Sequence, residues 1–150
     1  MFETELDMSL KFEQYLKANF GSTFIKECQG LFGVPDFLFY VKQKKETSVI
    51  AFELKLKNWQ RAAKQAFRYK MFSNTSYVVL PEATVGNALA NIELFQKYNI
   101  GLAKFDMNGS FAILFKPKPT LPYSEELNKK VLSSVDFSRK RTRNAGVFFD

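Results

Sequence analysis

Two apolar runs, residues 34–41 and 49–56, stand out in the hydrophobic pattern because a charged segment, KQKKETS, separates them. Both runs are rich in Val, Ile, Phe and Tyr, so the pattern predicts a β-hairpin. Side chains alternate between the two faces of a strand, and Glu53 and Lys55 are therefore expected to share one face of the second strand. An acidic and a basic group would then point the same way at the end of this hairpin.

Three further segments carry apolar residues at helical spacing. Residues 3–20 form the first predicted helix, with Gly21 as a suitable C-terminal stop. Its apolar stripe consists of Leu6, Leu10, Leu16 and Phe20, with Met8, Phe12 and Tyr15 beside it. The second predicted helix covers residues 59–72 after Asn58, a good N-cap residue, and the third covers residues 86–98. The inward side of the second helix is expected to contain Trp59, Ala63, Ala66, Phe67 and Lys70.

Apolar runs also predict the remaining strands, which cover residues 22–28, 75–80, 100–105 and 111–115. The run 75–80 is apolar on both faces and is expected to be buried on both. A helix between two strands favours a parallel crossover connection. The resulting order, α-β-β-β-α-β-α-β-β, predicts an α/β fold with a central mixed β-sheet flanked by helices.

The length of 150 residues is sufficient for one folded domain with a substantial core. We place this domain at residues 1–116, because three prolines follow closely from residue 117. Residues 117–150 are expected to form a C-terminal extension with a short helix over 124–135. The basic run 139–143 could contact nucleic acid, but a solvated tail is the preferred interpretation.

Lys and Arg outnumber Asp and Glu by 22 to 15, which gives a net charge of +7. A basic balance favours a polyanionic partner, although a generally basic surface is the alternative explanation. Histidine is absent, which excludes Ser-His, Cys-His and His-metal catalysis within this chain. The acid–base groups that remain for chemistry are those of Asp, Glu and Lys.

Cys28 is the only cysteine, so an intramolecular disulfide and a thiolate zinc site are excluded. We expect it to be a small buried residue on a strand. No run of 18 apolar residues occurs, and the acidic N-terminal segment lacks a signal-peptide pattern. These features favour a cytoplasmic protein that does not enter a membrane.

Asp36 joins Glu53 and Lys55 as a candidate site residue, because it lies at the start of the first hairpin strand. In an antiparallel pair the start of one strand lies beside the end of the other, which brings Asp36 near Glu53 and Lys55. Two carboxylates supply the oxygen ligands that Mg²⁺ prefers, and a lysine can orient water or neutralise phosphate charge. The alternative is an ordinary turn residue and a solvated strand face.

The sequence Pro35-Asp36, followed by Glu53-Leu54-Lys55, resembles the motif of the PD-(D/E)XK nuclease superfamily. That motif is a PD pair and then an acidic-x-Lys triplet on the next strand. The resemblance implies a restriction-endonuclease-like core in which Asp36 and Glu53 bind Mg²⁺, with Mn²⁺ able to substitute. It makes Lys55 the catalytic lysine, and the carbonyl group of Leu54 is a candidate further ligand.

Three more residues take candidate roles from this resemblance. Many members of the superfamily carry a glutamate on the helix before the hairpin, so Glu13 would be an outer metal ligand. Glu5 competes for that role, and a plain surface charge is the alternative for Glu13. The string QAFRY is similar to the Gln-x-x-x-Tyr motif of RecB-like and λ-exonuclease-like members. Gln65 would then contact the metal-bound water or the lysine, and Tyr69 would contact DNA unless it packs helix against sheet.

Basic residues follow the ELK triplet at helical spacing, namely Lys57, Arg61, Lys64 and Arg68. Beside a metal site, such a stripe is expected to bind the phosphate backbone. The sequence therefore predicts a Mg²⁺-dependent deoxyribonuclease, with endonuclease and exonuclease action both open. A non-catalytic nucleic-acid-binding module that retains the nuclease fold is the alternative, and an assembly protein with an apolar surface is a third. The chain has no P-loop, so a helicase or translocase partner would be a separate subunit. A homodimer is a further candidate assembly.

Overall fold

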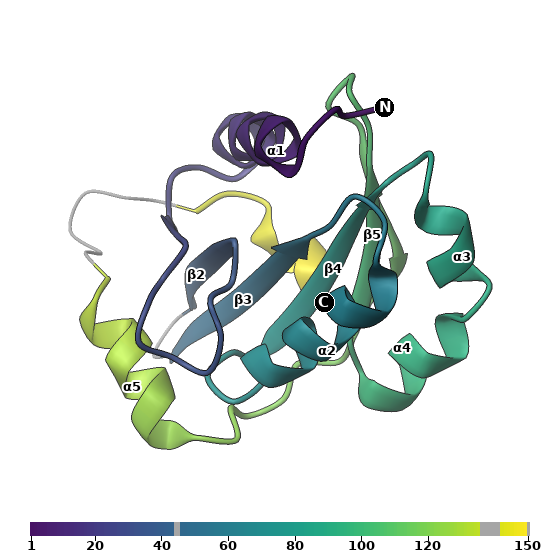
Figure 1. The fold of residues 1–150 in the computed structure, drawn as a ribbon. Helices are drawn as coiled ribbons and strands as arrows, with labels where there is room; N and C mark the ends of the chain where they lie inside the picture. Colours follow the sequence, from purple (N-terminus) through teal and green to yellow (C-terminus); the bar gives the residue numbers. More distant parts are fainter. Residues whose placement is uncertain (44–45, 136–141, 150) are drawn as a thin grey trace.

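A computed structural model describes residues 1–43, 46–135 and 142–149 of the chain as an α/β fold with one six-stranded mixed sheet (Figure 1). The elements are α1 (Glu5–Asn19), β1 (Phe24–Lys26), β2 (Phe37–Gln43), β3 (Glu46–Leu54), α2 (Trp59–Tyr69), β4 (Thr75–Pro81), α3 (Val85–Leu89), α4 (Ile92–Tyr98), β5 (Gly101–Phe105), β6 (Phe111–Phe115), α5 (Glu125–Ser133) and the 3₁₀ helix η1 (Ala145–Phe148). The expected mixed sheet flanked by helices is confirmed.

The strands lie in the sheet in the order in which they occur along the chain, β1 to β6. The β3–β4 and β4–β5 pairs are parallel and the other three pairs are antiparallel. The predicted hairpin is therefore β2–β3, with Phe37 opposite Phe52, and α2 makes the predicted parallel crossover to β4. In consequence, the start of β2 lies at the same edge of the sheet as the end of β3.

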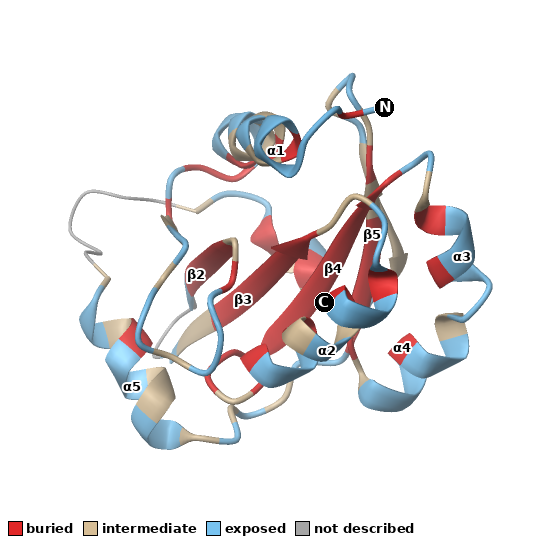
Figure 2. Cartoon of the chain, viewed as in Figure 1, coloured by how far each residue is buried: buried red, intermediate tan, exposed pale blue. Residues whose placement is uncertain are grey.

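One face of the sheet is covered by α1 and η1 and contains much of the phenylalanine of the chain. Met8, Phe12 and Leu16 occur at four-residue intervals on α1, so they form one row that faces the sheet. Phe12 contacts the rings of Phe37, Phe52 and Phe105 at centroid distances of 5.3–5.5 Å. Figure 2 shows that the central strands beneath these helices are buried.

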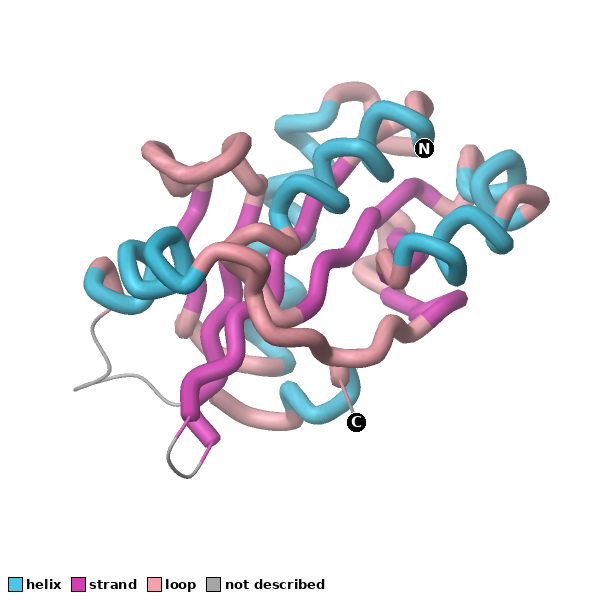
Figure 3. The backbone as a smooth tube through the Cα atoms, turned by 90° about the horizontal axis from the view of Figure 1, so that it is seen from below, coloured by secondary structure: helices cyan, strands magenta, loops and turns pink. Residues whose placement is uncertain are grey.

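The opposite face of the sheet is covered by α2, α3, α4 and α5, so helices lie on both sides of the strands (Figure 3). Ala62 and Ala66 are fully buried on the side of α2 that faces the sheet. Their small side chains let the helix approach the sheet closely. The predicted N-cap of α2 is confirmed, because Asn58 accepts a hydrogen bond from the Arg61 N–H at 3.2 Å. The Ser124 hydroxyl caps α5 in the same way, with the Leu127 N–H as donor.

Several predictions about single elements were wrong in detail. The segment 86–98 is two helices, because Asn91 leaves the helical conformation and its side chain donates to the carbonyl of Asn87. Leu6 and Leu10 are exposed, since each lies two residues from the buried row of α1 and so points away from the sheet. Cys28 is half-buried and follows β1, which ends before Glu27 takes a positive φ of 47°.

Parts of the predicted C-terminal extension pack against the sheet. Val131 of α5 and Phe148 of η1 are both buried, one on each face. Residues 139–141 of the basic run lie outside the described residues. Arg143 is described, and its guanidinium donates to the carbonyl groups of Lys17 and Ala18 at the end of α1.

Candidate active site

Asp36 is held beside the end of β3 by two hydrogen bonds. Its backbone N–H donates to the carbonyl of Phe52 at 3.1 Å, and its Oδ2 accepts from the N–H of Leu54 at 2.7 Å. These bonds continue the hairpin one step beyond the pair formed by Phe37 and Phe52. The expected proximity of Asp36 to Glu53 and Lys55 therefore follows from antiparallel pairing at this end of the hairpin.

Glu53 is a buried carboxylic acid near the end of β3, with only 4% of the residue exposed. It shares its face of the strand with Val49 and Ala51, which pack against the end of α2. Burial raises the pKa of Glu53 to about 8, and the Asp36 carboxylate adds to this rise. Without a bound cation, Glu53 therefore holds its proton at neutral pH.

The pKa of Asp36 is also raised, but less than that of Glu53. Burial raises the pKa of Asp36 to about 6, the hydrogen bond from Leu54 opposes the rise, and the charge of Glu5 adds to it. The ammonium of Lys55 lowers the pKa of both acids but does not cancel the effect of desolvation. The site thus holds two carboxyl groups that a nearby cation would stabilise in the ionised form.

Tyr69 holds the Glu53 side chain in place. The Tyr69 hydroxyl lies 2.6 Å from Glu53 Oε1 and 3.0 Å from the carbonyl oxygen of Val34. When Glu53 is ionised, the single hydroxyl proton is donated to the carboxylate. When Glu53 is protonated, the acid can donate to the hydroxyl, which then donates to Val34. Tyr69 itself keeps its proton, because burial and then the Glu53 charge raise its pKa.

The burial of Tyr69 corrects the expectation that this residue contacts DNA. The side chain is only 1% exposed, so it presents no surface to a nucleic acid. Tyr69 instead packs between α2 and the sheet, which was the alternative interpretation, and it also forms a hydrogen bond with Glu53. Sequence reasoning missed this link, because the Gln-x-x-x-Tyr spacing gives no information on which side of the helix faces the sheet.

Lys55 follows β3 and lies at the border between site and solvent. Its side chain is 19% exposed, and its Nζ lies 3.8 Å from Oε1 of the more exposed Glu5. A pair of this length near solvent is weak and readily broken. The ammonium of Lys55 is therefore accessible at the mouth of the acidic site.

The structure brings Glu5 to this group of residues and leaves Glu13 outside it. Glu13 lies eight residues further along α1, about 12 Å along the helix axis. Its carboxylate is bound by Lys26 at 2.8 Å and by Lys17 at 3.2 Å. The hydrogen bond from Lys26 is the main cause that holds the pKa of Glu13 below its usual value. This arrangement matches the surface-charge interpretation of Glu13.

Gln65 lies one helical turn before Tyr69, on the same side of α2. Its Oε1 atom is enclosed and has no hydrogen-bond partner among the described residues. A buried acceptor without a donor is unfavourable by about 1–3 kcal/mol. The amide oxygen is therefore suited to accept a hydrogen bond from a bound water or ligand.

Gly33 allows the loop before Asp36 to pass close to Tyr69. Its φ is +88°, and a Cβ atom at this position would lie 2.9 Å from Cε1 of Tyr69. Only glycine accepts both this backbone conformation and this close contact without strain. The loop can therefore present the carbonyl of Val34 to the Tyr69 hydroxyl.

The basic stripe predicted after the ELK triplet is exposed along its whole length. We call Arg61, Lys64 and Arg68, which lie on the outer side of α2, the basic crest; Lys57 precedes the helix. None of these four side chains forms an ion pair with a residue that the structure describes. The guanidinium carbon of Arg68 lies 5.9 Å from the ring centroid of Phe32. The crest is thus available to an anionic ligand.

The described part of the chain contains no group of three or more Asp, Glu or Cys side chains placed to hold a metal ion. Asp36 and Glu53 are a pair, so a metal at this position would need backbone and water oxygens to complete its coordination. Within the same residues, no helix is both long and apolar enough to cross a membrane. Comparisons of the chain with protein-family models, curated proteins and solved structures give no significant match.

Proposed function

We propose that the chain is a divalent-metal-dependent nuclease that hydrolyses phosphodiester bonds in DNA on a restriction-endonuclease-like core. The observation that carries this proposal is the convergence of Asp36, Glu53 and Lys55 at one end of the β2–β3 hairpin. A buried carboxyl group and a half-buried one, beside an ammonium at the edge of the site, can bind a divalent cation and a phosphate together. The spacing of the PD and ELK segments and the mixed α/β sheet support the same proposal.

The donor set fits Mg²⁺, and Mn²⁺ as its substitute. Mg²⁺ uses one or two carboxylates and keeps several waters, and Asp36 and Glu53 would supply those carboxylates. Oδ2 of Asp36 accepts from Leu54, which leaves Oδ1 for the ion. The Leu54 carbonyl is a candidate third oxygen. When bound, the ion supplies an acidified water and neutralises charge on the phosphate.

The other residues of the site act on water and phosphate. Lys55 can exchange its loose pair with Glu5 for a phosphate oxygen and stabilise the charge that develops there. Gln65 can accept a hydrogen bond from the attacking water through its enclosed amide oxygen. Tyr69 keeps Glu53 in one orientation throughout, so it is a positioning residue. The basic crest binds the phosphate backbone, which makes binding strongly dependent on salt.

Cleavage assays with site variants test the proposal. Supercoiled plasmid and linear single- and double-stranded DNA are incubated with the parent chain in Mg²⁺, Mn²⁺ or EDTA. We expect metal-dependent cleavage by the parent, and losses of about 100-fold or more in Asp36→Ala and Lys55→Ala, with DNA binding retained. Glu13→Gln is the matched control, because it changes an acid of α1 outside the site. Parent-like cleavage by both Asp36→Ala and Lys55→Ala would refute the site.

A second function is supported by the basic crest alone. The crest cations are exposed and do not depend on the carboxyl groups for their position. The chain could therefore bind nucleic acid without cutting it. In that case DNA binding falls with salt, and no divalent metal stimulates cleavage of any of the substrates.

A further inference from the structure

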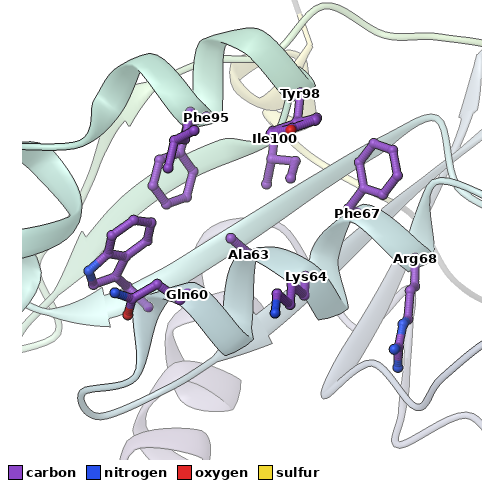
Figure 4. A pocket seen from close by; sticks show the side chains of 10 residues that line it. Gln60, Ala63, Lys64, Phe67, Arg68, Phe95, Tyr98 and Ile100 are labelled. Carbon is purple, nitrogen blue, oxygen red and sulfur yellow. The ribbon is translucent and has the colours of Figure 1, made fainter.

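An apolar groove lies between α2 and α4 (Figure 4). Its volume is about 460 Å³, within the range of pockets that bind small organic groups. Figure 4 shows side chains from the two helices converging on this space. The apolar lining includes Trp59, Ala63, Phe67, Leu94, Tyr98 and Ile100.

Three apolar side chains in the walls of the groove are partly exposed to solvent. Phe67, Leu94 and Tyr98 are 41%, 43% and 44% exposed, and the Phe67 and Tyr98 rings touch at a centroid distance of 5.6 Å. Adjoining apolar residues at the rim of a concave pocket are typical of ligand-binding surfaces. An aromatic ligand or side chain would therefore gain contact with rings that are already held in place.

The charged groups that line the groove are both basic. Lys64 and Arg68 of the basic crest line its edge, and no carboxylate of a described residue lines it. Lys97, outside the lining, is a third cation nearby, with its ammonium 5.4 Å from the ring centroid of Tyr98. The groove thus combines an apolar interior with a cationic edge, which fits a ligand with apolar rings and negative charge.

Helix geometry connects the groove to the candidate active site. Phe67 and Tyr69 are two residues apart, so they point to opposite flanks of α2. Lys64 and Arg68 lie on the solvent side between these flanks, as the spacing of the helix requires. A chain of phosphates that crosses the crest would have the active site on one side and the groove on the other. The distance across a helix is about 10 Å, a span of a few nucleotides.

We propose that the groove binds an unpaired base of a single-stranded nucleic acid whose backbone crosses the basic crest. The proposal rests on the nuclease function and specifies its substrate as single strands or frayed ends. A base in a duplex is paired and stacked, and turning it out would cost a few kcal/mol. Aromatic rings beside a basic track are the means by which proteins bind single strands without sequence preference. Continuity with the active site through Arg68 favours nucleic acid over an acidic peptide as the occupant.

Binding assays without cleavage test this proposal. Fluorescence anisotropy in EDTA measures the affinity of the chain for a labelled oligothymidylate and for a blunt hairpin duplex of equal length. We expect Phe67→Ala to weaken single-strand binding about tenfold and to leave duplex binding unchanged. Leu94→Ala, on the opposite wall, should act in the same direction. Tyr123→Ala is the matched control, because that exposed ring contacts the same Lys70 ammonium as Phe67 but lies outside the groove.

The salt dependence of binding separates the groove from the crest. Lys64→Ala should reduce the slope of log affinity against log salt for single strands by about 0.7, because it removes one phosphate contact. Phe67→Ala should leave that slope unchanged, since it removes no charge. A lower slope in Phe67→Ala would contradict a base-binding role.

Several outcomes would overturn the inference. They are unchanged single-strand affinity in Phe67→Ala, an equal loss for single strands and duplex, and failure of the parent to bind single strands. An acidic amphipathic peptide that binds the parent but not Phe67→Ala, while single strands bind both equally, would assign the groove to a protein partner. Failure of the nuclease proposal is a separate result, because it appears as an absence of Asp36-dependent cleavage while groove-dependent binding persists.

Discussion

Among single residues, Tyr69 determines how the most deeply buried acid of the site is held. Its hydroxyl satisfies Glu53 in both protonation states, and Val34 provides the second acceptor. A buried carboxyl group without such a partner would be strongly destabilising. The candidate site can therefore keep Glu53 fixed before any cation or substrate binds.

Tyr69→Phe tests this support. We expect the free energy of unfolding to fall by about 1–3 kcal/mol, because the buried carboxyl group of Glu53 loses its hydrogen-bond partner. The hydrogen bond from Tyr69 lowers the pKa of Glu53, so its loss should raise that pKa further. Urea unfolding measures the first effect, and the pH profile of metal-dependent cleavage, shifted to higher pH, measures the second. Tyr123→Phe, at an exposed ring, should change neither; an unshifted profile in Tyr69→Phe would contradict the role.

At the scale of elements, the loop that leads into β2 is shaped by its contact with α2. Gly33 brings the backbone against the Tyr69 ring, and its positive φ points the loop toward the site. Gly86, in α3, offers the contrast, because a Cβ atom there would meet no atom within 4 Å. The two glycines therefore differ in what an added methyl group would do.

Gly33→Ala and Gly86→Ala form a matched pair. Gly33→Ala should lower the free energy of unfolding by more than about 1 kcal/mol, because alanine is strained at positive φ and would press on Tyr69. Gly86→Ala should raise it by about 0.5–1 kcal/mol, because alanine is the better helix former. Thermal and urea unfolding of both variants measure these changes. A Gly33→Ala variant as stable as the parent would show that the loop is not constrained as described.

The hairpin could be predicted from the sequence, and the orientation of α2 could not. Alternation along a strand has a period of two, so the faces of Glu53 and Lys55 follow directly once the strand is recognised. On α2 the apolar residues cover more than one face, and alanines on either side could have faced the sheet. The structure buries Ala62, Ala66 and Tyr69 and leaves Phe67 exposed, a choice made by packing against β4 and the loop.

In the folded molecule Asp36 and Glu53 stay protonated up to a higher pH than they would in the unfolded chain. The pKa of Asp36 rises from 3.8 to about 6 and that of Glu53 from 4.5 to about 8. Between about pH 4 and pH 8 the folded chain therefore binds more protons at these groups than the unfolded chain does. The contribution of both groups to the free energy of unfolding must fall as the pH rises through this range.

Urea unfolding at several pH values in EDTA tests this sign. We expect stability to decrease from pH 5 to pH 8 by an amount on the order of a few kcal/mol, and Glu53→Gln to decrease less. The contribution of Glu13 to the free energy of unfolding rises with pH, in a lower pH range, because its pKa is lowered in the folded chain. Added Ca²⁺ should raise the melting temperature more at pH 8 than at pH 5, since it binds the ionised carboxylates. A Glu53→Gln variant with the full parental slope would contradict the assignment.

The buried position of Phe148 has a consequence for the synthesis of this protein. Its ring packs against Phe20, Phe52 and Tyr77, on the same sheet face as α1, although α1 is made first. A ribosome must deliver residue 148 before this aromatic layer can close. Until then the nascent polypeptide presents an open phenylalanine surface, so we expect translation arrest before this position to yield chains that depend on chaperones.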